Sequence, residues 1–384
     1  MTKKIKLGEL FCGPGGFAEG AHRTKKFEHI WAIDNHKDTT KTFKLNHPNT
    51  RVETWDLNTI TKKQIRSLEP VEGLIFGFPC NDFSKIGKFP GLAGKYGPLY
   101  KKACHVLQNL KKKPDFFVAE NVSNIAPLDK FNSTQGRVRI FDNFHIIMQD
   151  LAKCGYTIYA DLLNFKDYSV PQIRKRVILF GIRSDLDKKK HYRKPRKTSG
   201  KKPITCKEAL SKLKKYKNLE NNEYIEHPKY IIQRLKKQKP GQNVWDINGL
   251  PGVKSARMSH IYKRLDPNLP AYTVTGSGGG GTYMYHYKEP RALSNRERAT
   301  IQTFPIKYKF YGNRSSIRRQ IGMAVPVKGA QAIMNNVYKT MKFTKKNLNH
   351  IEDHDWYIKA KTKKLFWRGE DLKKKHGIKK GKVK

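Results

Sequence analysis

The segment ELFCGPGGFAEG, residues 9–20, joins an apolar run to a helical pattern through a turn rich in glycine. Gly13, Gly15 and Gly16 would let the backbone approach a ligand closely, and the start of the following helix offers free N–H groups. The spacing differs from the G-x-G-x-x-G pattern of dinucleotide-binding folds, so it does not favour pyrophosphate binding. It predicts a strand, a ligand-binding turn and a helix at the start of an α/β domain.

The first half of the chain continues this alternation of short β-rich runs and helical patterns. The predicted strands are 7–11, 30–33, 52–55, 74–78, 116–119, 156–163 and 176–182, and the predicted helices lie near 17–24, 38–45, 100–112 and 137–153. Alternating strands and helices indicate a doubly wound, mostly parallel sheet with helices on both faces.

The alternation stops after residue 183, where the chain becomes dense in lysine and is broken by proline and glycine. Periodicity returns near Tyr272. We therefore expect a main domain at residues 1–183, a smaller domain at 184–260, a return to both over 261–342 and a basic extension at 343–384. The extension would either lie on phosphate or form a disordered end.

The charge of the chain is strongly unbalanced, with 79 Lys and Arg against 32 Asp and Glu, a formal net charge of +47. Such a field favours polyanions, because basic side chains release the counterions condensed on phosphates. Lysine enrichment from a biased genome is the alternative. A nucleic-acid partner is the prediction.

The five cysteines form no C-x-x-C pair and no even disulfide framework, which favours a reducing cytoplasm. No apolar stretch approaches the length needed to span a bilayer. Cys80 stands out because it follows the apolar run 73–78, at the carboxyl end of a predicted strand, where parallel sheets present their chemistry. The alternative is a buried cysteine that packs as a small hydrophobic residue.

Two carboxylates follow successive predicted strands beside the glycine turn. Asp34 ends the second strand, where it can accept both hydroxyls of a ribose, and Asp56 follows the third, where it can bind the amine of an adenine. Either residue alone would suit a turn or a helix cap. Together they predict a nucleoside pocket, and an adenosine cofactor without phosphates suggests S-adenosylmethionine.

Six motifs carry a resemblance to the cytosine-C5 DNA methyltransferases over nearly the whole chain, in that family's usual order. They are FCGPGG at 11–16, FPCNDFS at 78–84, ENV at 120–122, QIRKR at 172–176, RERATIQTFP at 296–305 and RQIGMAVP at 319–326. Three positions depart from the pattern: Asn81 replaces Gln, Thr300 replaces Arg and Met323 replaces Asn. The methionine puts one polar contact near the cofactor in doubt, and none of the three changes removes a catalytic group.

The resemblance implies a class I, Rossmann-like methyltransferase that uses S-adenosylmethionine to methylate C5 of a flipped-out cytosine in double-stranded DNA. Cys80 would add to C6 of the base, and Glu120 would hydrogen-bond or protonate N3. Arg174 and Arg176 would contact the cytosine O2 and organise Glu120 and Cys80, with Arg176 preferred for the base.

The resemblance also implies the remaining site residues and partners. Residues 184–260 would be the target-recognition region. The protein would act as a monomer alongside a restriction endonuclease, and no metal is expected. The implied cofactor contacts are Phe11, Gly13, Gly15, Gly16, Asp34, Asp56, Phe78 and Leu99, and the implied DNA contacts are Ser84, Lys88, Arg264 and Thr273.

Two other functions remain open on the sequence. An RNA cytosine methyltransferase could share these motifs, but the tRNA-acting branch usually carries a C-F-T string, and Cys206 lies instead in ITCKEA. A catalytically silent DNA-binding relative is the second. The presence of Cys80, Glu120 and Arg176 argues against it, since a silent relative need keep none of them.

Overall fold

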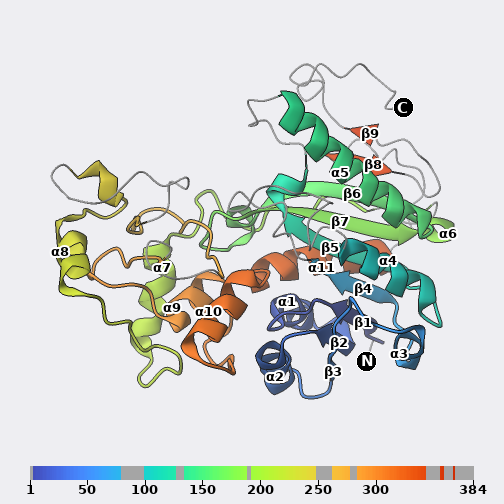
Figure 1. The fold of residues 1–384 in the computed structure, drawn as a ribbon, viewed down its shortest axis with the longest axis horizontal. Helices are drawn as coiled ribbons and strands as arrows, with labels where there is room; N and C mark the ends of the chain where they lie inside the picture. The colour runs from blue at the N-terminus through green and yellow to red at the C-terminus, as the bar shows by residue number, and fades with distance from the viewer. Residues whose placement is uncertain are drawn as a thin grey trace.

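A mixed sheet forms the centre of the molecule in the computed structural model, which describes residues 3–78, 99–126, 134–187, 192–247, 262–276, 283–342, 355–358 and 366–367 (Figure 1). The strand order within these residues is β3-β2-β1-β4-β5-β7-β6-β8-β9. The strands are β1 Ile5–Leu10, β2 Phe27–Asp34, β3 Arg51–Thr54, β4 Gly73–Phe76, β5 Phe116–Val122, β6 Tyr156–Asn164, β7 Lys175–Arg183, β8 Trp356–Ile358 and β9 Phe366–Trp367.

The first five strands pair in parallel, and β7 runs antiparallel to its neighbours β5 and β6. Each of the seven strands predicted from the sequence is present. All four residues of β4 are buried, as expected of a strand covered on both faces. The predicted doubly wound, mostly parallel sheet is confirmed.

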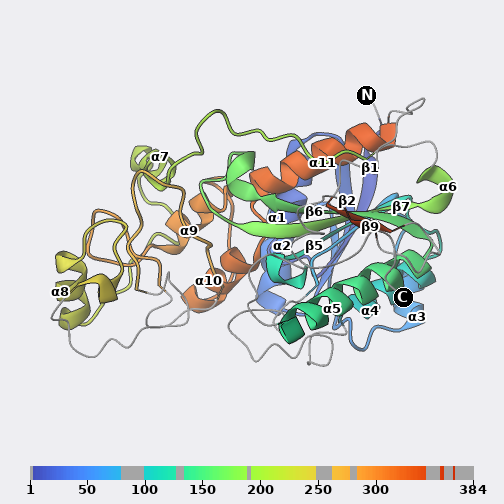
Figure 2. The same ribbon diagram turned by 90° about the horizontal axis from the view of Figure 1, so that it is seen from above.

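Helices cover both faces of this sheet (Figure 2). The helices of this unit are α1 Gly16–Arg23, α2 Lys37–Asn46, α3 Lys62–Ser67, α4 Leu99–Asn109, α5 Thr134–Lys153, α6 Ser184–Asp187 and α11 Val327–Lys342. Side chains of α3, α4 and α5 share one apolar core with one face of the sheet, and those of α1 and α11 share another with the opposite face. No helix in the described part of the chain is long and apolar enough to cross a membrane.

A second unit lies beyond one end of the sheet (Figure 1). Its helices are α7 Cys206–Ser211, α8 Lys229–Lys237, α9 Asn295–Ile301 and α10 Arg314–Met323. Helices α7, α9 and α10 contribute to a separate apolar core that includes Leu210, Leu265, Ile301 and Ile321, while Leu235 of α8 belongs to a small cluster of its own. Much of the chain between them is irregular, so its buried backbone groups need partners other than a sheet ladder.

The boundary expected at residue 184 is wrong, because the chain stays on the sheet after β7. The Tyr192 ring stacks on Phe180, with ring centroids 4.2 Å apart. The hydroxyl of Tyr168 donates to the carbonyl of Pro195 at 3.0 Å, and the Thr198 amide donates to a backbone oxygen of Asp167. The main domain therefore continues to about residue 199.

The described part of the C-terminal extension belongs to the sheet, which neither of the two expectations for it anticipated. Strand β8 pairs with β6, and the buried ring of Trp356 packs edge-on against Phe144. Asp355 accepts hydrogen bonds from the Leu162 amide at 2.9 Å and from Lys194 Nζ at 2.8 Å. A buried ring and two directional bonds thus hold this short strand against the edge of the sheet.

Two buried glutamines join the two units. Gln172 precedes β7; its Oε1 accepts from the Val274 amide at 2.9 Å and its Nε2 donates to Gln302 Oε1 at 2.8 Å. Gln302 in turn donates to the carbonyls of Ile321 at 2.7 Å and Ala324 at 3.0 Å. Both side chains are fully buried, so each bond lost would leave a polar group without water.

Replacing Gln302 with leucine should lower the free energy of unfolding by about 2–4 kcal/mol, because Gln172 and two carbonyls would lose a partner. Gln233→Leu on α8 is the matched control, since Gln233 is exposed; its change should stay within about 0.5 kcal/mol. Urea denaturation measures both. Equal stability of the two variants would contradict the role given to this junction.

Candidate active site

The carboxyl ends of the parallel strands bring the predicted site residues to one edge of the sheet. The glycine turn follows β1, Asp34 ends β2, and Glu120 lies in the last part of β5. Cys80, Ser84 and Lys88 lie outside the described residues. Phe78, two residues before Cys80, is described and follows β4.

The glycine turn has a backbone that favours glycine at two positions. Gly13 and Gly15 have positive φ values of 57° and 90°. A Cβ on Gly15 would lie 2.7 Å from the hydroxyl of Tyr308, which donates to the carbonyl of Pro14 at 2.6 Å. A Cβ on Gly13 would meet nothing within 4 Å, so this side of the turn is open. Tyr308 of the second unit therefore fixes the turn at Pro14, while the turn stays open at Gly13.

Two further residues of the turn, Phe11 and Gly16, have different structural roles. Phe11 has φ 51°, a rare conformation for a residue with a side chain, and such strain concentrates at ligand sites. A Cβ on Gly16 would lie 2.4 Å from the Val325 carbonyl. Gly16 therefore allows α1 to approach the segment before α11, which is a packing role.

The two predicted acidic residues have different surroundings. The carboxylate of Asp34 accepts from the amides of Gly13 and His36, both at 3.0 Å. Burial raises the pKa of Asp34, and the two N–H donors oppose that rise. Asp56 is exposed, and its Oδ1 accepts from the backbone and side chain of Asn58 at 2.9 and 3.1 Å. Asp34 is thus bonded to the glycine turn, whereas Asp56 forms a local turn.

The other two cofactor candidates are buried in the apolar core. Phe78 packs near Tyr100, with ring centroids 6.1 Å apart, and Leu99 begins α4. At Phe78 the backbone is at the strand end, while the ring belongs to the core.

Asn121 fixes the end of β4 and was not singled out from the sequence. Its side chain is 1% exposed, and Nδ2 donates to the Phe78 carbonyl at 3.1 Å while Oδ1 accepts from the Val122 amide at 2.8 Å. The signal was an amide inside an apolar strand, where it must find partners. Asn121 thereby holds the backbone from which the chain continues to Cys80.

Glu120 and Arg176 form an ion pair across two strands. Arg176 Nε lies 2.8 Å from Glu120 Oε1, and each side chain is 12% exposed. Because Val122 pairs with Arg176 in the β5–β7 ladder, Glu120 and Arg176 are diagonal neighbours on one face. A Cβ on Gly77 would lie 3.6 Å from Glu120 Oε2, so the end of β4 passes beside this pair.

Arg174 is directed to the junction between the units. It precedes β7, is buried, and donates to the carbonyls of Val274 at 3.0 Å, Gly322 at 3.3 Å and Ala324 at 3.2 Å. Of the two arginines predicted to organise the catalytic centre, the structure therefore brings Arg176 to Glu120.

The described DNA-contact candidates also bond within the protein. Arg264 is buried and donates to the carbonyls of Leu235, Gln238, His286 and Tyr287 at 2.7–3.1 Å. Burial lowers its pKa. These bonds commit the Arg264 guanidinium to backbone carbonyls of the second unit. The hydroxyl of Thr273 donates to the Ile173 carbonyl at 2.9 Å.

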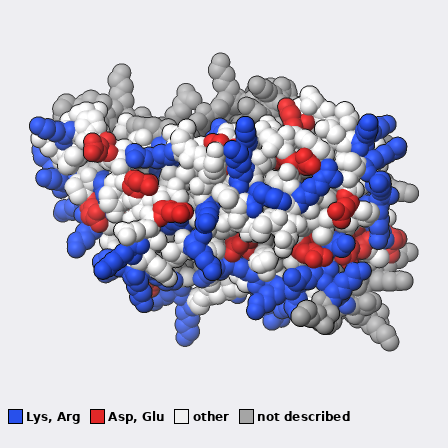
Figure 3. Space-filling model, turned by 90° about the horizontal axis from the view of Figure 1, so that it is seen from below, with Lys and Arg blue, Asp and Glu red and all other residues white. Residues whose placement is uncertain are grey.

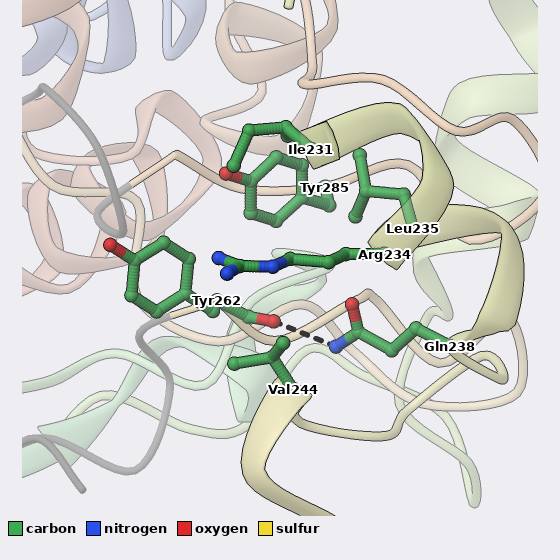
Figure 4. A pocket seen from close by; sticks show the side chains of 7 residues that line it. All are labelled: Ile231, Arg234, Leu235, Gln238, Val244, Tyr262 and Tyr285. Atoms are coloured by element: carbon green, nitrogen blue, oxygen red, sulfur yellow. Dashed lines mark hydrogen bonds between the residues drawn. The ribbon is translucent and has the colours of Figure 1, made fainter. Parts of the chain in front are cut away.

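A small pocket lies in the second unit beside α8 (Figure 4). Gln238 Nε2 donates to the Tyr262 carbonyl at 2.7 Å along its edge. Its lining residues are Ile231, Arg234, Leu235, Gln238, Val244, Tyr262 and Tyr285. None of them is a predicted site residue, so this pocket is separate from the strand ends.

Basic side chains are spread widely over the surface. Figure 3 shows Lys and Arg over both units on one face, with Asp and Glu between them. The charge therefore does not by itself mark a path for a ligand. Among the residues described, no group of three or more His, Cys, Asp or Glu side chains is arranged to hold a metal ion.

Comparison with known proteins agrees with this arrangement. A family model described as C-5 cytosine-specific DNA methylase matches residues 5–339. Type II methyltransferase M.BbvI of Brevibacillus brevis is 40% identical over 359 residues, which cover 88% of this chain and 91% of that protein. Type II methyltransferase M.NgoFVII of Neisseria gonorrhoeae is 34% identical over 368 residues, covering 94% and 92%.

A solved structure shares the fold. It is a DNA modification methyltransferase encoded within an E. coli prophage, with a TM-score of 0.65 and 20% identity over 88% of this chain and 100% of that one. Its identity is too low to carry more than the fold. The family match spans both units and every described motif, and the chain therefore belongs to the C-5 cytosine-specific DNA methylase family.

Proposed function

We propose that this DNA cytosine-5 methyltransferase transfers the methyl group of S-adenosylmethionine to a flipped-out cytosine through a covalent bond between Cys80 and C6. The observation that carries the proposal is the Glu120–Arg176 ion pair beside Gly77, at the edge of the sheet where β4 continues toward Cys80. An acid and a guanidinium held together there suit a pyrimidine ring that must accept negative charge.

The residues around the glycine turn fit the cofactor. A carboxylate has about four acceptor positions, and the amides of Gly13 and His36 use two at Asp34, which leaves capacity for the ribose hydroxyls. Both bonds at Asp56 involve Oδ1, so Oδ2 remains for the adenine amine. The open side of Gly13 gives the ligand close access to the backbone. When bound, the cofactor would supply the methyl group from its sulfonium and would be left as S-adenosylhomocysteine.

The chain's own residues then account for activation of the base. The Cys80 thiolate adds to C6, forming an S–C6 bond and moving electrons to C5, which can then accept the methyl group. Glu120 gives a proton to N3 as the charge develops. Water then takes the C5 proton, the electrons of that C–H bond re-form the C5=C6 double bond, and the S–C6 bond breaks to restore the thiolate. N3 returns its proton to Glu120.

Arg176 can serve Glu120 and the base together. Its Nε lies in the ion pair with Glu120 and its Nη1 donates to the Lys175 carbonyl at 2.8 Å, so Nη2 can serve the cytosine O2. Arg174 and Arg264 would act on the base only indirectly, because their guanidinium groups donate to backbone carbonyls of the second unit.

The second unit would recognise the DNA sequence. Cytosine C5 is inaccessible to Cys80 inside a duplex, so the base must leave the stack. As the family resemblance implied, the enzyme would act as a monomer and protect DNA from a restriction endonuclease; the relatives carry the name Type II methyltransferase. Because the matching family is described as a C-5 cytosine-specific DNA methylase, the RNA methyltransferase alternative is not favoured.

Cys80→Ala should abolish methyl transfer to plasmid DNA while cofactor affinity stays nearly unchanged, because the thiol acts on the base. Cys154→Ala is the matched control, because Cys154 is buried just before the start of β6, at the end of the sheet opposite the site. Labelled cofactor followed by bisulfite sequencing measures activity and target together. If Cys80→Ala kept even about a tenth of wild-type turnover, the covalent mechanism would be wrong.

Asp34→Ala should weaken cofactor binding by about 1.5–3 kcal/mol, the range for hydrogen bonds to a charged group. Asp56→Ala should cost less, because Asp56 is exposed and solvent competes for its bonds. Calorimetry compares the two variants, and the methylated sequence should not change in either. If Asp34→Ala binds the cofactor as tightly as wild type, Asp34 only stabilises the glycine turn and does not contact the cofactor.

A further inference from the structure

Helix α10 of the second unit lies beside α2 of the main domain (Figure 1). Two residues of α2, Asp38 and Thr42, are four positions apart and therefore lie on one face of that helix. Ser316 Oγ of α10 donates to Asp38 Oδ2 at 2.7 Å, and the Tyr311 amide, just before α10, donates to Thr42 Oγ1 at 2.8 Å. The second unit thus holds the helix that follows the predicted ribose carboxylate.

Arg319 extends this contact to the loop between β2 and α2. It lies three residues after Ser316 on α10, so the two side chains are neighbours on the helix. Its Nη2 contacts Nε2 of His36, the residue that precedes α2. The His36 amide donates to Asp34 Oδ1 at 3.0 Å. Arg319 therefore contacts the residue that holds one oxygen of the Asp34 carboxylate.

The same arginine acts on the charge of Asp34. Burial raises the pKa of Asp34, while the two backbone donors and the side chains of His36 and Arg319 oppose that rise. A guanidinium stays protonated across the working range of an enzyme, so Arg319 contributes a constant positive charge. Arg319 thus favours the ionised form of a carboxyl group that burial would otherwise keep protonated.

The other neighbours of Asp34 do not supply a positive charge. Burial, and then the negative charge of Asp34, raises the pKa of Glu9 and of Cys12, which favours the uncharged form of each. On the adjacent strand β3, Asp34 pairs with Thr54, which has no charge. The support for an ionised Asp34 therefore comes from its own loop and from α10.

We propose that Arg319 is a positioning residue for the cofactor: it holds His36 in place and keeps the Asp34 carboxylate ionised. This rests on the proposed function, because it takes Asp34 as the acceptor for the ribose hydroxyls. An ionised carboxylate only accepts hydrogen bonds, whereas a protonated one carries an O–H and has less acceptor capacity. Arg319 acts on the cofactor through Asp34, so the second unit contributes to a site at the strand ends of the main domain.

Calorimetric titration with S-adenosylmethionine, without DNA, tests this role from about pH 8 to about pH 5. Arg319→Met removes the charge and Arg319→Lys keeps it. Arg314→Met is the matched control, because Arg314 is also an exposed arginine of α10. Since both arginines are exposed, the variants should fold, and melting curves check that they do.

Loss of the Arg319 charge should raise the pKa of Asp34. As the pH falls, Asp34 would then take up its proton earlier in Arg319→Met than in wild type, so the difference in affinity should grow toward low pH. It should reach about two- to fivefold, because solvent weakens the effect of an exposed charge, and about 0.5 M salt should reduce it. Arg319→Lys and Arg314→Met should follow the wild-type pH profile.

Asp34→Asn separates this inference from the proposed function. If Asp34→Asn weakens binding but Arg319→Met matches wild type at every pH, Arg319 has no positioning role. A loss in Arg319→Met that does not depend on pH, or that persists when Asp34→Asn is also present, would overturn it as well, because Arg319 would then act without Asp34. If Asp34→Asn binds as tightly as wild type, the ribose contact in the proposed function is wrong, and the role of Arg319 falls with it.

Discussion

The hydrogen bond between Gln172 and Gln302 is the constraint on which the arrangement of the two units depends. Both amides are fully buried, so every donor and acceptor they carry must be matched for the fold to be stable. The Gln302 carbonyl accepts from the Val327 amide at 3.1 Å, which fixes the start of α11. Helix α11 packs on α1, and α1 begins at the glycine turn. The position of the second unit and the shape of the cofactor turn are therefore set together.

The segment QIRKR links this junction to the chemistry of the base. It runs extended, so alternate side chains face the same way: Gln172 and Arg174 are buried, while Ile173 and Lys175 are exposed. The first two inward side chains hold the second unit, and the third, Arg176, pairs with Glu120. A displacement of the second unit would thus be transmitted along four residues of backbone to the ion pair.

The sequence predicted the regular elements well and the tertiary contacts poorly. Strand and helix periods are local, and all seven predicted strands and the helices α1, α2, α4 and α5 are present. The short helix α3 and the strand β8 were missed, because elements of so few residues are too short to show a clear hydrophobic period. The boundary at 184 was wrong because lysine content does not reveal that Tyr192 stacks on Phe180. The bond from Asn121 to the end of β4 depends on strand register, which one sequence does not specify.

The buried arginines show that part of the large positive charge is structural. Arg264 donates to the carbonyls of Leu235 and Gln238, where α8 ends, and Arg174 donates to those of Gly322 and Ala324, where α10 ends. A cation at a helix carboxyl end satisfies carbonyls that the helix leaves unpaired and complements its dipole. In an irregular unit, such bonds replace the ladder that a sheet would provide. The net charge therefore overstates the number of cations free to meet a polyanion.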